Sequence, residues 1–211
     1  MDNNIEKYSI LDKFNVSRET YLDFEKFISL ILVENQKKNI ISKKTELIIR
    51  ERHIIDSAQA IDFIDLNDNI CSDLGSGGGM PGIVLAIMMK NSNKPMRFNL
   101  YEKSYHKSSF LRDVSKKLNL DTEIIQKDVF NNKNLSSGTI IARAFKPLPT
   151  VLELIYKNFK NYKNLILFMG KNGKETLRDV LKEWNFEYKE KKSLTSVDSF
   201  LLNIRNIKKK N

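Results

Sequence analysis

The chain has 211 residues and a formal net charge of +10 at pH 7, from 36 lysine and arginine residues against 26 aspartate and glutamate residues. This length suffices for one domain with a sizeable core, and the ordinary hydrophobic and charged fractions, 41% and 29%, argue against a disordered chain. No apolar run is long enough to cross a bilayer, which argues against a helical membrane protein. The positive charge favours a polyanionic partner such as nucleic acid, although basic enzymes with small substrates share it.

The N-terminal residues and the cysteine content favour the cytoplasm as the compartment. Residues 1–6 are acidic and polar, so they lack the basic and then apolar order of a secretory signal. Cys71 is the single cysteine, cannot form an internal disulfide, and lies in an apolar segment, which favours a core thiol in a reducing compartment over a reactive nucleophile. No Cys/His cluster has metal-ligand spacing. We therefore expect a cytoplasmic monomer without a metal.

The first 65 residues are predicted to form a helical cap. Residues 17–38 carry apolar side chains at the spacing of one helix face, with Ser17 in a position to cap the helix. A second helical pattern covers residues 45–64 and is predicted to be interrupted by residues 52–57.

From residue 66 to 211 the pattern changes to short apolar runs that alternate with helices, as in a mainly parallel α/β sheet. Strands are predicted at residues 70–74, 97–102, 123–126, 139–142, 165–169, 187–191 and 200–205. Helices are predicted at residues 82–90, 106–118, 149–159 and 174–184. The sequence thus predicts a Rossmann-like, doubly wound sheet of seven strands that ends in an antiparallel hairpin.

A glycine-rich stretch follows the first predicted strand and reads Asp73-Leu74-Gly75-Ser76-Gly77-Gly78-Gly79-Met80-Pro81-Gly82. Glycines permit positive φ and let a ligand approach the main chain, and Pro81 suits the first turn of the helix that follows. Ligands of parallel sheets bind at the carboxyl ends of the strands, where this loop lies. The stretch therefore predicts a site for a nucleoside cofactor.

Two cofactor classes fit the glycine pattern. Gly77, Gly79 and Gly82 satisfy the dinucleotide motif G-x-G-x-x-G, and Glu102 lies at about the distance of the acid that binds a ribose. Asp73, however, would repel a pyrophosphate and suits the sulfonium and ammonium groups of S-adenosylmethionine. Glu102 can bind ribose hydroxyls in either cofactor. Asp73 thus favours a methyltransferase, while an NAD(P)-dependent oxidoreductase and a non-catalytic basic RNA-binding module remain alternatives.

Several ordered motifs resemble those of the bacterial 16S ribosomal RNA guanine-N7 methyltransferase family, called RsmG or glucose-inhibited division protein B. The resemblance covers most of the chain from about Ile40 onward. The matching segments are residues 52–57 (Arg-His-Ile-Ile-Asp-Ser), the glycine-rich stretch 73–82, Glu102 with Lys107 and residues 110–112, and residues 142–144 (Ala-Arg-Ala). The resemblance implies a class I S-adenosylmethionine-dependent methyltransferase fold that methylates guanine N7 in the decoding-centre loop of 16S RNA or of the 30S subunit.

The resemblance also implies the residues of the site. The cofactor contacts are expected at Asp73, Gly75, Ser76, Gly77, Gly79, Met80, Glu102, Asp128, Val129 and Arg143, with Asp128 near the adenine. Residues 52–57 are expected to close over the pocket. Two segments depart from the family pattern: Lys127-Asp128 stands where an arginine is usual, and the lysine of Gly170-Lys171 follows the glycine instead of preceding it.

Guanine N7 carries an in-plane lone pair and no proton, so its methylation requires no general base, and catalysis would rest on positioning. Arg143 and Lys171 are the candidates for catalysis and for contact with the acceptor. An arginine at a strand end can hold a phosphate or stack on a base, and the alternative for Arg143 is a structural ion pair. His53 is interpreted as packing beneath the cofactor loop or as touching the substrate, and His106 as a surface residue.

Overall fold

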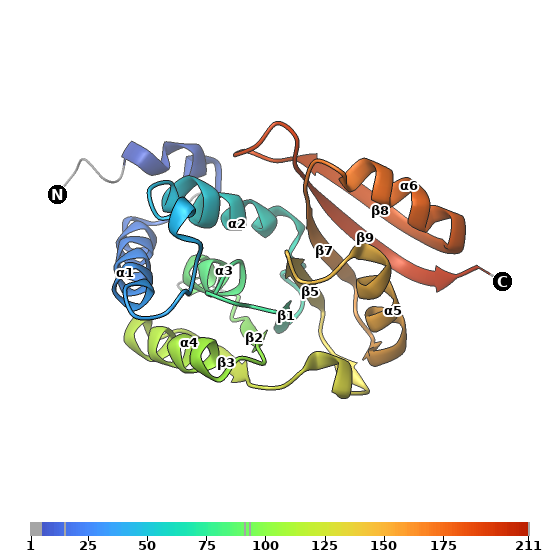
Figure 1. The fold of residues 1–211 in the computed structure, drawn as a ribbon, viewed down its shortest axis with the longest axis horizontal. Helices are drawn as coiled ribbons and strands as arrows, with labels where there is room; N and C mark the ends of the chain where they lie inside the picture. The colour runs from blue at the N-terminus through green and yellow to red at the C-terminus, as the bar shows by residue number, and fades with distance from the viewer. Residues whose placement is uncertain (1–5, 15, 91, 93, 211) are drawn as a thin grey trace.

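A computed structural model describes residues 6–14, 16–90, 92 and 94–210, and it shows one twisted sheet between two groups of helices (Figure 1). The strand order is β3-β2-β1-β5-β7-β9-β8. All neighbouring strands from β3 to β7 are parallel, whereas β9 is antiparallel to both β7 and β8. The predicted doubly wound sheet with a terminal hairpin is confirmed. The winding direction changes at β1, which places a ligand crevice at the carboxyl end of that strand.

All seven predicted strands and four predicted helices are present, with ends shifted slightly. The large sheet consists of β1 (Ile70–Leu74), β2 (Arg97–Tyr101), β3 (Thr122–Ile125), β5 (Thr139–Arg143), β7 (Asn164–Met169), β8 (Trp184–Lys192) and β9 (Phe200–Lys209). The α-helices are α1 (Arg18–Asn35), α2 (Asp56–Ala58), α3 (Gly82–Met89), α4 (Tyr105–Leu118), α5 (Leu148–Asn158) and α6 (Gly173–Glu183). An unpredicted parallel pair joins β4 (Leu135–Ser136) to β6 (Phe159–Lys160), and short helical turns form η2 (Glu6–Phe14), η3 (Lys43–Thr45), η4 (Arg50–Ile55), η5 (Gln59–Phe63) and η6 (Val129–Asn131).

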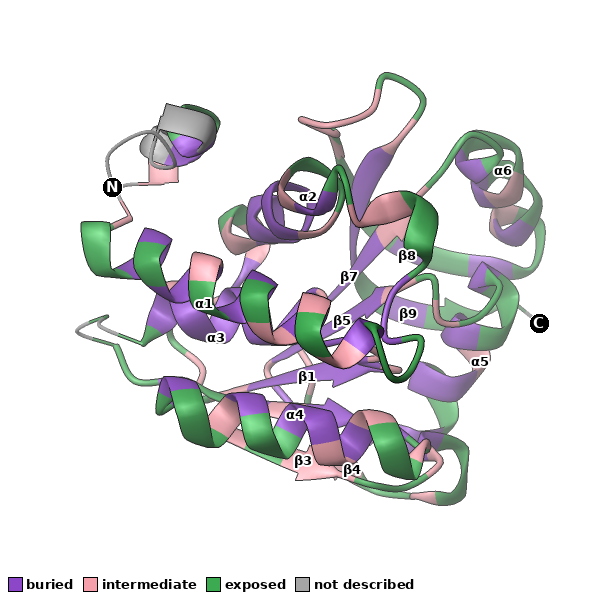
Figure 2. Cartoon of the chain, turned by 60° about the vertical axis from the view of Figure 1, so that its left-hand side comes forward, coloured by how far each residue is buried: buried purple, intermediate pink, exposed green. Residues whose placement is uncertain are grey.

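The two faces of the sheet are buried by different helices. Because successive strand residues point to opposite faces, Ile141 packs into the cluster that contains α1, α3 and α4, whereas Ile140 and Ala142 pack into the cluster that contains α5 and α6. Helix α3 is buried along nearly its whole length, while α1 and α4 keep one exposed side (Figure 2). Burial of β1 and α3 on both sides holds the intervening glycine loop on a rigid base.

The N-terminal cap packs directly on the sheet domain. Ser17 accepts a hydrogen bond from the Thr20 N–H at the start of α1, which confirms the predicted cap. Phe24 and Phe27 of α1 share one core cluster with residues of α3 and β2. The predicted interruption at residues 52–57 is wrong, because residues 50–63 form one helical run of π, α and 3-10 turns that buries Ile54 and Ile55. The domain division at residue 65 stays a prediction, although the two parts share this core.

Replacing Gly82 by alanine should destabilise the fold. A Cβ at Gly82 would lie 2.4 Å from Leu100 Cδ2 and 2.6 Å from Asp73 Oδ2, which forces β1, β2 and α3 apart. We expect Gly82→Ala to lower the free energy of unfolding by about 1–3 kcal/mol in urea titrations. The control is Gly170→Ala, where a Cβ meets nothing within 4 Å and the change should stay within about 0.5 kcal/mol. Equal effects of the two variants would contradict this packing argument.

Candidate active site

The loop between β1 and α3 exposes its backbone because its glycines adopt conformations that other residues avoid. Gly75 has φ +72°, and a Cβ there would lie 2.3 Å from Phe145 Cδ2. Gly77 has φ +55°, and its Cβ would meet only the Gly75 carbonyl oxygen, at 3.7 Å. The first glycine therefore permits close packing, whereas the second leaves open space in which a ligand can approach the main chain.

Glu102, directly after β2, is bound to the glycine loop. Its Oε2 accepts a hydrogen bond from the Gly77 N–H at 2.9 Å, and its Oε1 accepts one from the Ser104 N–H at 2.8 Å. The carboxylate is thus held in one orientation, with a residue exposure of 8%. Each carboxylate oxygen has a second lone pair, so Glu102 can still accept hydrogen bonds from two ribose hydroxyls.

Asp73 supports the loop from behind. It is fully buried, its Oδ2 accepts a hydrogen bond from the Gly82 N–H at 3.0 Å, and its Oδ1 has no partner among the described residues. Burial raises the pKa of Asp73 to about 7, against the opposing effect of the hydrogen bond from the Gly82 N–H. Asp73 and Gly79 do not line the pockets described below, and their predicted contact with the cofactor stays a prediction.

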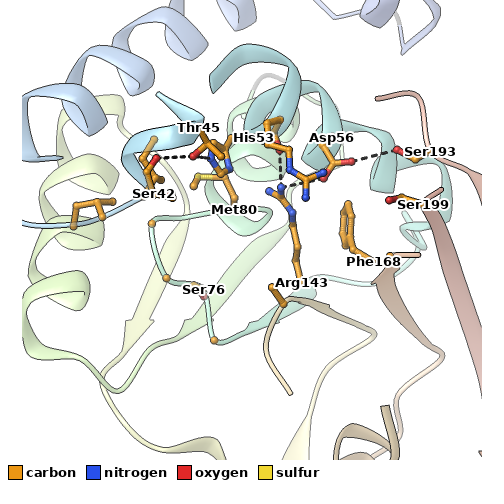
Figure 3. A pocket seen from close by; sticks show the side chains of 18 of the residues that line it. Ser42, Thr45, His53, Asp56, Ser76, Met80, Arg143, Phe168, Ser193 and Ser199 are labelled. Atoms are coloured by element: carbon orange, nitrogen blue, oxygen red, sulfur yellow. Dashed lines mark hydrogen bonds and ion pairs between the residues drawn. The ribbon is translucent and has the colours of Figure 1, made fainter. Parts of the chain in front are cut away.

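A central pocket of about 660 Å³ opens between the glycine loop and the N-terminal cap. Its lining includes six predicted site residues, namely Gly75, Ser76, Gly77, Met80, Glu102 and Arg143. The cap contributes Arg52, His53 and Asp56, which confirms the expectation that residues 52–57 close over the pocket. Figure 3 shows His53 and Asp56 of the cap on one side of the pocket and Ser76 of the glycine loop on the other.

Two smaller pockets continue the central one along the strand ends. The β3-side pocket, of about 210 Å³, shares Gly75 and Glu102 with the central pocket and adds Asp128 and Val129. The β7-side pocket, of about 530 Å³, shares Phe168 and Gly170 with the central pocket and contains Lys171. Lys171 is therefore separate from the glycine loop, on an exposed segment after β7. The three pockets form a crevice across the carboxyl ends of β1, β2, β5 and β7.

Arg143 ends β5 and reaches across the central pocket to the cap (Figure 3). Its Nη2 lies 3.0 Å from Asp56 Oδ2 and donates to the Arg52 carbonyl oxygen at 2.6 Å, while Nη1 donates to Ser57 Oγ at 3.3 Å. Burial lowers the pKa of Arg143, and the carboxylate of Asp56 opposes that shift. The ion pair that the sequence left as the alternative for Arg143 is thus present, and the predicted contacts of Arg143 with the cofactor and the acceptor stay predictions. The guanidinium also lies 5.8 Å from the centre of the Phe168 ring.

Asp56 connects the cap to the turn between β8 and β9. Besides Arg143, its carboxylate accepts hydrogen bonds from Gln59 Nε2 at 2.9 Å and Thr195 Oγ1 at 2.9 Å, and a longer one from Ser193 Oγ at 3.4 Å. Asp56 is buried, so these donors satisfy a carboxylate that water barely reaches. One side chain thus fixes three segments that are distant in the sequence.

His53 lies on the cap side of the central pocket, where its Nε2 is 2.8 Å from Thr45 Oγ1. Burial lowers the pKa of His53 to about 4, and the positive charges of Arg143 and Arg52 add to the shift. The imidazole is therefore neutral near pH 7.

Sequence reasoning missed part of the pocket wall. Ser42 and Thr45 precede the recognised cap motif, and Ser193 and Ser199 lie in the β8–β9 turn. The polar run at residues 193–199 indicates a turn between strands, but its position over the pocket depends on the antiparallel insertion of β9 between β7 and β8. Among the described residues, no group of three or more His, Cys, Asp or Glu side chains is placed to hold a metal ion, and no helix is long and apolar enough to span a membrane.

Asp56→Asn should destabilise the protein strongly. The change leaves the guanidinium of Arg143 buried without its counter-charge, which we expect to cost about 3–5 kcal/mol of unfolding free energy. The control is Asp179→Asn, which removes the charge from an exposed pair with Lys182 and should leave the urea midpoint within error. Similar midpoints for the two variants would show that the buried pair does not hold the cap.

The chain is similar to known ribosomal RNA methyltransferases. A family model described as rRNA small subunit methyltransferase G matches residues 20–207. A curated protein of Pelagibacter ubique, named ribosomal RNA small subunit methyltransferase G, is 58% identical over 213 residues, with full coverage of both chains.

Solved structures agree on the fold. A SAM-dependent methyltransferase from Aquifex aeolicus has a TM-score of 0.54 at 13% identity, covering 74% of this chain and 91% of its own. TrmK of M. capricolum, in complex with S-adenosyl-homocysteine, has a TM-score of 0.53 at 16% identity, covering 71% and 66%. The fold is therefore that of class I S-adenosylmethionine-dependent methyltransferases. The full-length identity and the family match show that the chain belongs to the rRNA small subunit methyltransferase G family.

Proposed function

We propose that this protein transfers the methyl group of S-adenosylmethionine to N7 of a guanine in the decoding-centre loop of 16S ribosomal RNA. Family membership supports the reaction class and the ribosomal substrate. The crevice supports the cofactor, because it combines an open glycine backbone at Gly77 with an oriented carboxylate at Glu102. The enzyme would act in the cytoplasm as a monomer.

The residues of the crevice fit the parts of S-adenosylmethionine. Asp128 and Val129 of the β3-side pocket would hold the adenine, and Glu102 would accept the ribose hydroxyls. Gly75, Ser76 and Gly77 would line the methionine moiety where the central pocket begins. The bound cofactor supplies a methyl group activated on a cationic sulfur. Asp73 would hold the loop in place by accepting the hydrogen bond from the Gly82 N–H, and Asp73 and Gly79 would complete the contacts to the cofactor.

The protein's own part in the chemistry is positioning. Guanine N7 attacks through an in-plane lone pair, so no side chain has to remove a proton first. The neutral state of His53 is compatible with this, because no base is needed. The pocket walls have to hold N7 in line with the methyl group and exclude water, and the anchored cap and the fixed loop suit that task.

The observation that supports RNA as the substrate is a cationic rim, by which we mean the basic side chains that line the three pockets. Six basic residues line the pockets and have no carboxylate partner among the described residues: Arg52, Lys103, Lys107, Lys127, Lys146 and Lys171. Among the described residues, the lysines that form ion pairs all lie outside the pocket linings, and they are Lys26, Lys90, Lys157, Lys163, Lys174, Lys182, Lys191 and Lys209. Unpaired cations at the crevice are available to phosphates of an RNA backbone.

Methyl transfer is tested with 30S subunits and with protein-free 16S RNA from cells that lack this modification. We expect methyl incorporation from S-adenosylmethionine, and mass-spectrometric mapping should place N7-methylguanosine at a single position in the decoding-centre loop. The two substrates distinguish free RNA from the assembled particle as the acceptor. A folded protein that binds S-adenosylmethionine but methylates neither substrate would contradict the proposal.

The cationic rim predicts a salt-dependent loss of RNA affinity. Lys103→Ala with Lys107→Ala removes two rim charges, one just before α4 and one in its first turn, and should lower the slope of log affinity against log salt by about 1–2. The matched control, Lys116→Ala with Lys117→Ala, removes two charges from the last turn of the same helix. The control should keep the wild-type slope in filter-binding titrations. Equal slopes for the two double variants would show that net charge alone, not the rim, attracts RNA.

A further inference from the structure

The hydrogen bonds of the cap define which nitrogen of His53 carries the proton. Thr45 Oγ1 donates its only proton to the Ser42 carbonyl oxygen at 2.8 Å. The same oxygen lies 2.8 Å from His53 Nε2, so in that contact it has to accept (Figure 3). His53 therefore carries its proton on Nε2. The neutral ring then presents a lone pair on Nδ1.

This lone pair has no partner within the described chain. His53 Nδ1 is buried and makes no hydrogen bond to any described residue, although His53 lines the central pocket. The ring does not take up a second proton near neutral pH, because burial and the positive charges of Arg143 and Arg52 lower the pKa of His53. Arg143 does not donate a hydrogen bond to Nδ1 either. Its Nη1 and Nη2 atoms contact Asp56, Ser57 and the Arg52 carbonyl oxygen instead. A buried acceptor at a pocket wall is satisfied most simply by a ligand donor.

We propose that His53 Nδ1 accepts a hydrogen bond from the Watson–Crick edge of the acceptor guanine, at N1–H or N2–H₂, and thereby selects guanine. This inference rests on the proposed function, because it assigns a residue to the base that receives the methyl group. It makes His53 a residue that contacts the substrate and not a base.

The shape of guanine supports this assignment. N7 and the N1–H and N2–H₂ donors lie on opposite edges of the base. A guanine that turns N7 toward a methyl group held at the glycine loop therefore turns its donors away from the loop. His53 lies on the cap side of the pocket, across from Ser76 of that loop (Figure 3). His53, which carries the acceptor nitrogen, is thus on the side that the donor edge faces.

The same contact gives both selectivity and transition-state stabilisation. Adenine has a lone pair at N1 and a C–H at position 2, so it has no donor where guanine has N1–H and N2–H₂, and its N1 adds a repulsive acceptor there. The amino group of adenine lies at position 6 instead, where guanine has O6. During methyl transfer the guanine ring gains positive charge, which makes its N–H groups stronger donors. A hydrogen bond to neutral His53 therefore strengthens as the reaction proceeds, and favours the transition state over the ground state.

The kinetic test compares His53→Phe, which keeps a ring but has no acceptor, with His53→Gln, which offers a carbonyl oxygen. We expect His53→Phe to lower kcat/KM for 30S subunits or 16S RNA by about 10- to 100-fold, with its dissociation constant for S-adenosylmethionine within about 2-fold of wild type. His53→Gln should recover part of the loss. His106→Phe, on the exposed surface, is the matched control and should keep wild-type kinetics.

The outcomes separate the possible ligands. Unchanged kinetics for His53→Phe would overturn the inference. Loss of S-adenosylmethionine affinity by the same factor as kcat/KM would also overturn it, and would assign the contact to the ammonium group of the cofactor. Absence of methyl transfer by the wild-type protein would refute the proposed function itself.

Nuclear magnetic resonance tests the protonation pattern without any activity measurement. The chain has two histidines, so the ¹⁵N signals of the ring nitrogens are readily assigned with a His106→Phe sample. At pH 7 the His53 signals should show a protonated Nε2 and an unprotonated Nδ1. Thr45→Val removes the acceptor for Nε2–H and should mix the two tautomers. A protonated Nδ1 in the wild-type protein would overturn the inference even if methyl transfer is normal.

Discussion

The crevice depends on the buried ion pair between Arg143 and Asp56, because it is the contact that fixes the cap over the strand ends. The two charges are removed from water, and their 3.0 Å contact offsets that cost only because the remaining donors and lone pairs also find partners. Arg143 bonds to Ser57 and to the Arg52 carbonyl, and Asp56 bonds to Thr195 of the β8–β9 turn. The cap, strand β5 and the terminal hairpin therefore form one wall.

The opposite wall is held by a different set of contacts, all made to backbone amides. Asp73 binds the Gly82 N–H from behind the loop, and Glu102 binds the Gly77 N–H from the side. These carboxylates replace the side-chain packing that a glycine loop cannot provide. Two walls that are fixed independently suit an in-line methyl transfer, in which the rate depends on the distance and the angle between two reacting atoms.

Local patterns in the sequence predicted most of this architecture. The apolar runs located all seven strands, and the glycine spacing located the loop, because both depend on neighbouring residues. The burial of Asp73 was not predictable, since a strand pattern does not show which polar side chains at a strand end are covered by neighbouring elements. The choice between an ion pair and a phosphate contact for Arg143 also required its partner, Asp56, which is far away in the sequence. The cap was misread at residues 52–57 because a change from π to α turns leaves no signal in composition.

The distribution of charge separates RNA capture from methyl transfer. Lys103, Lys107 and Lys171 line the pockets without a carboxylate partner among the described residues and are not buried, so phosphates can reach them. Inside, Arg143 is neutralised by Asp56, and burial keeps His53 uncharged. This matters because the reaction moves one positive charge from the cofactor sulfur to the guanine ring. An unpaired cation beside the ring would oppose that transfer, whereas a neutral acceptor on the cap favours it. A protein that attracts a polyanion can thus also stabilise a cationic base, provided that the buried cation of its pocket, Arg143, is paired and that the unpaired cations of the pocket lining, such as Arg52, are not buried.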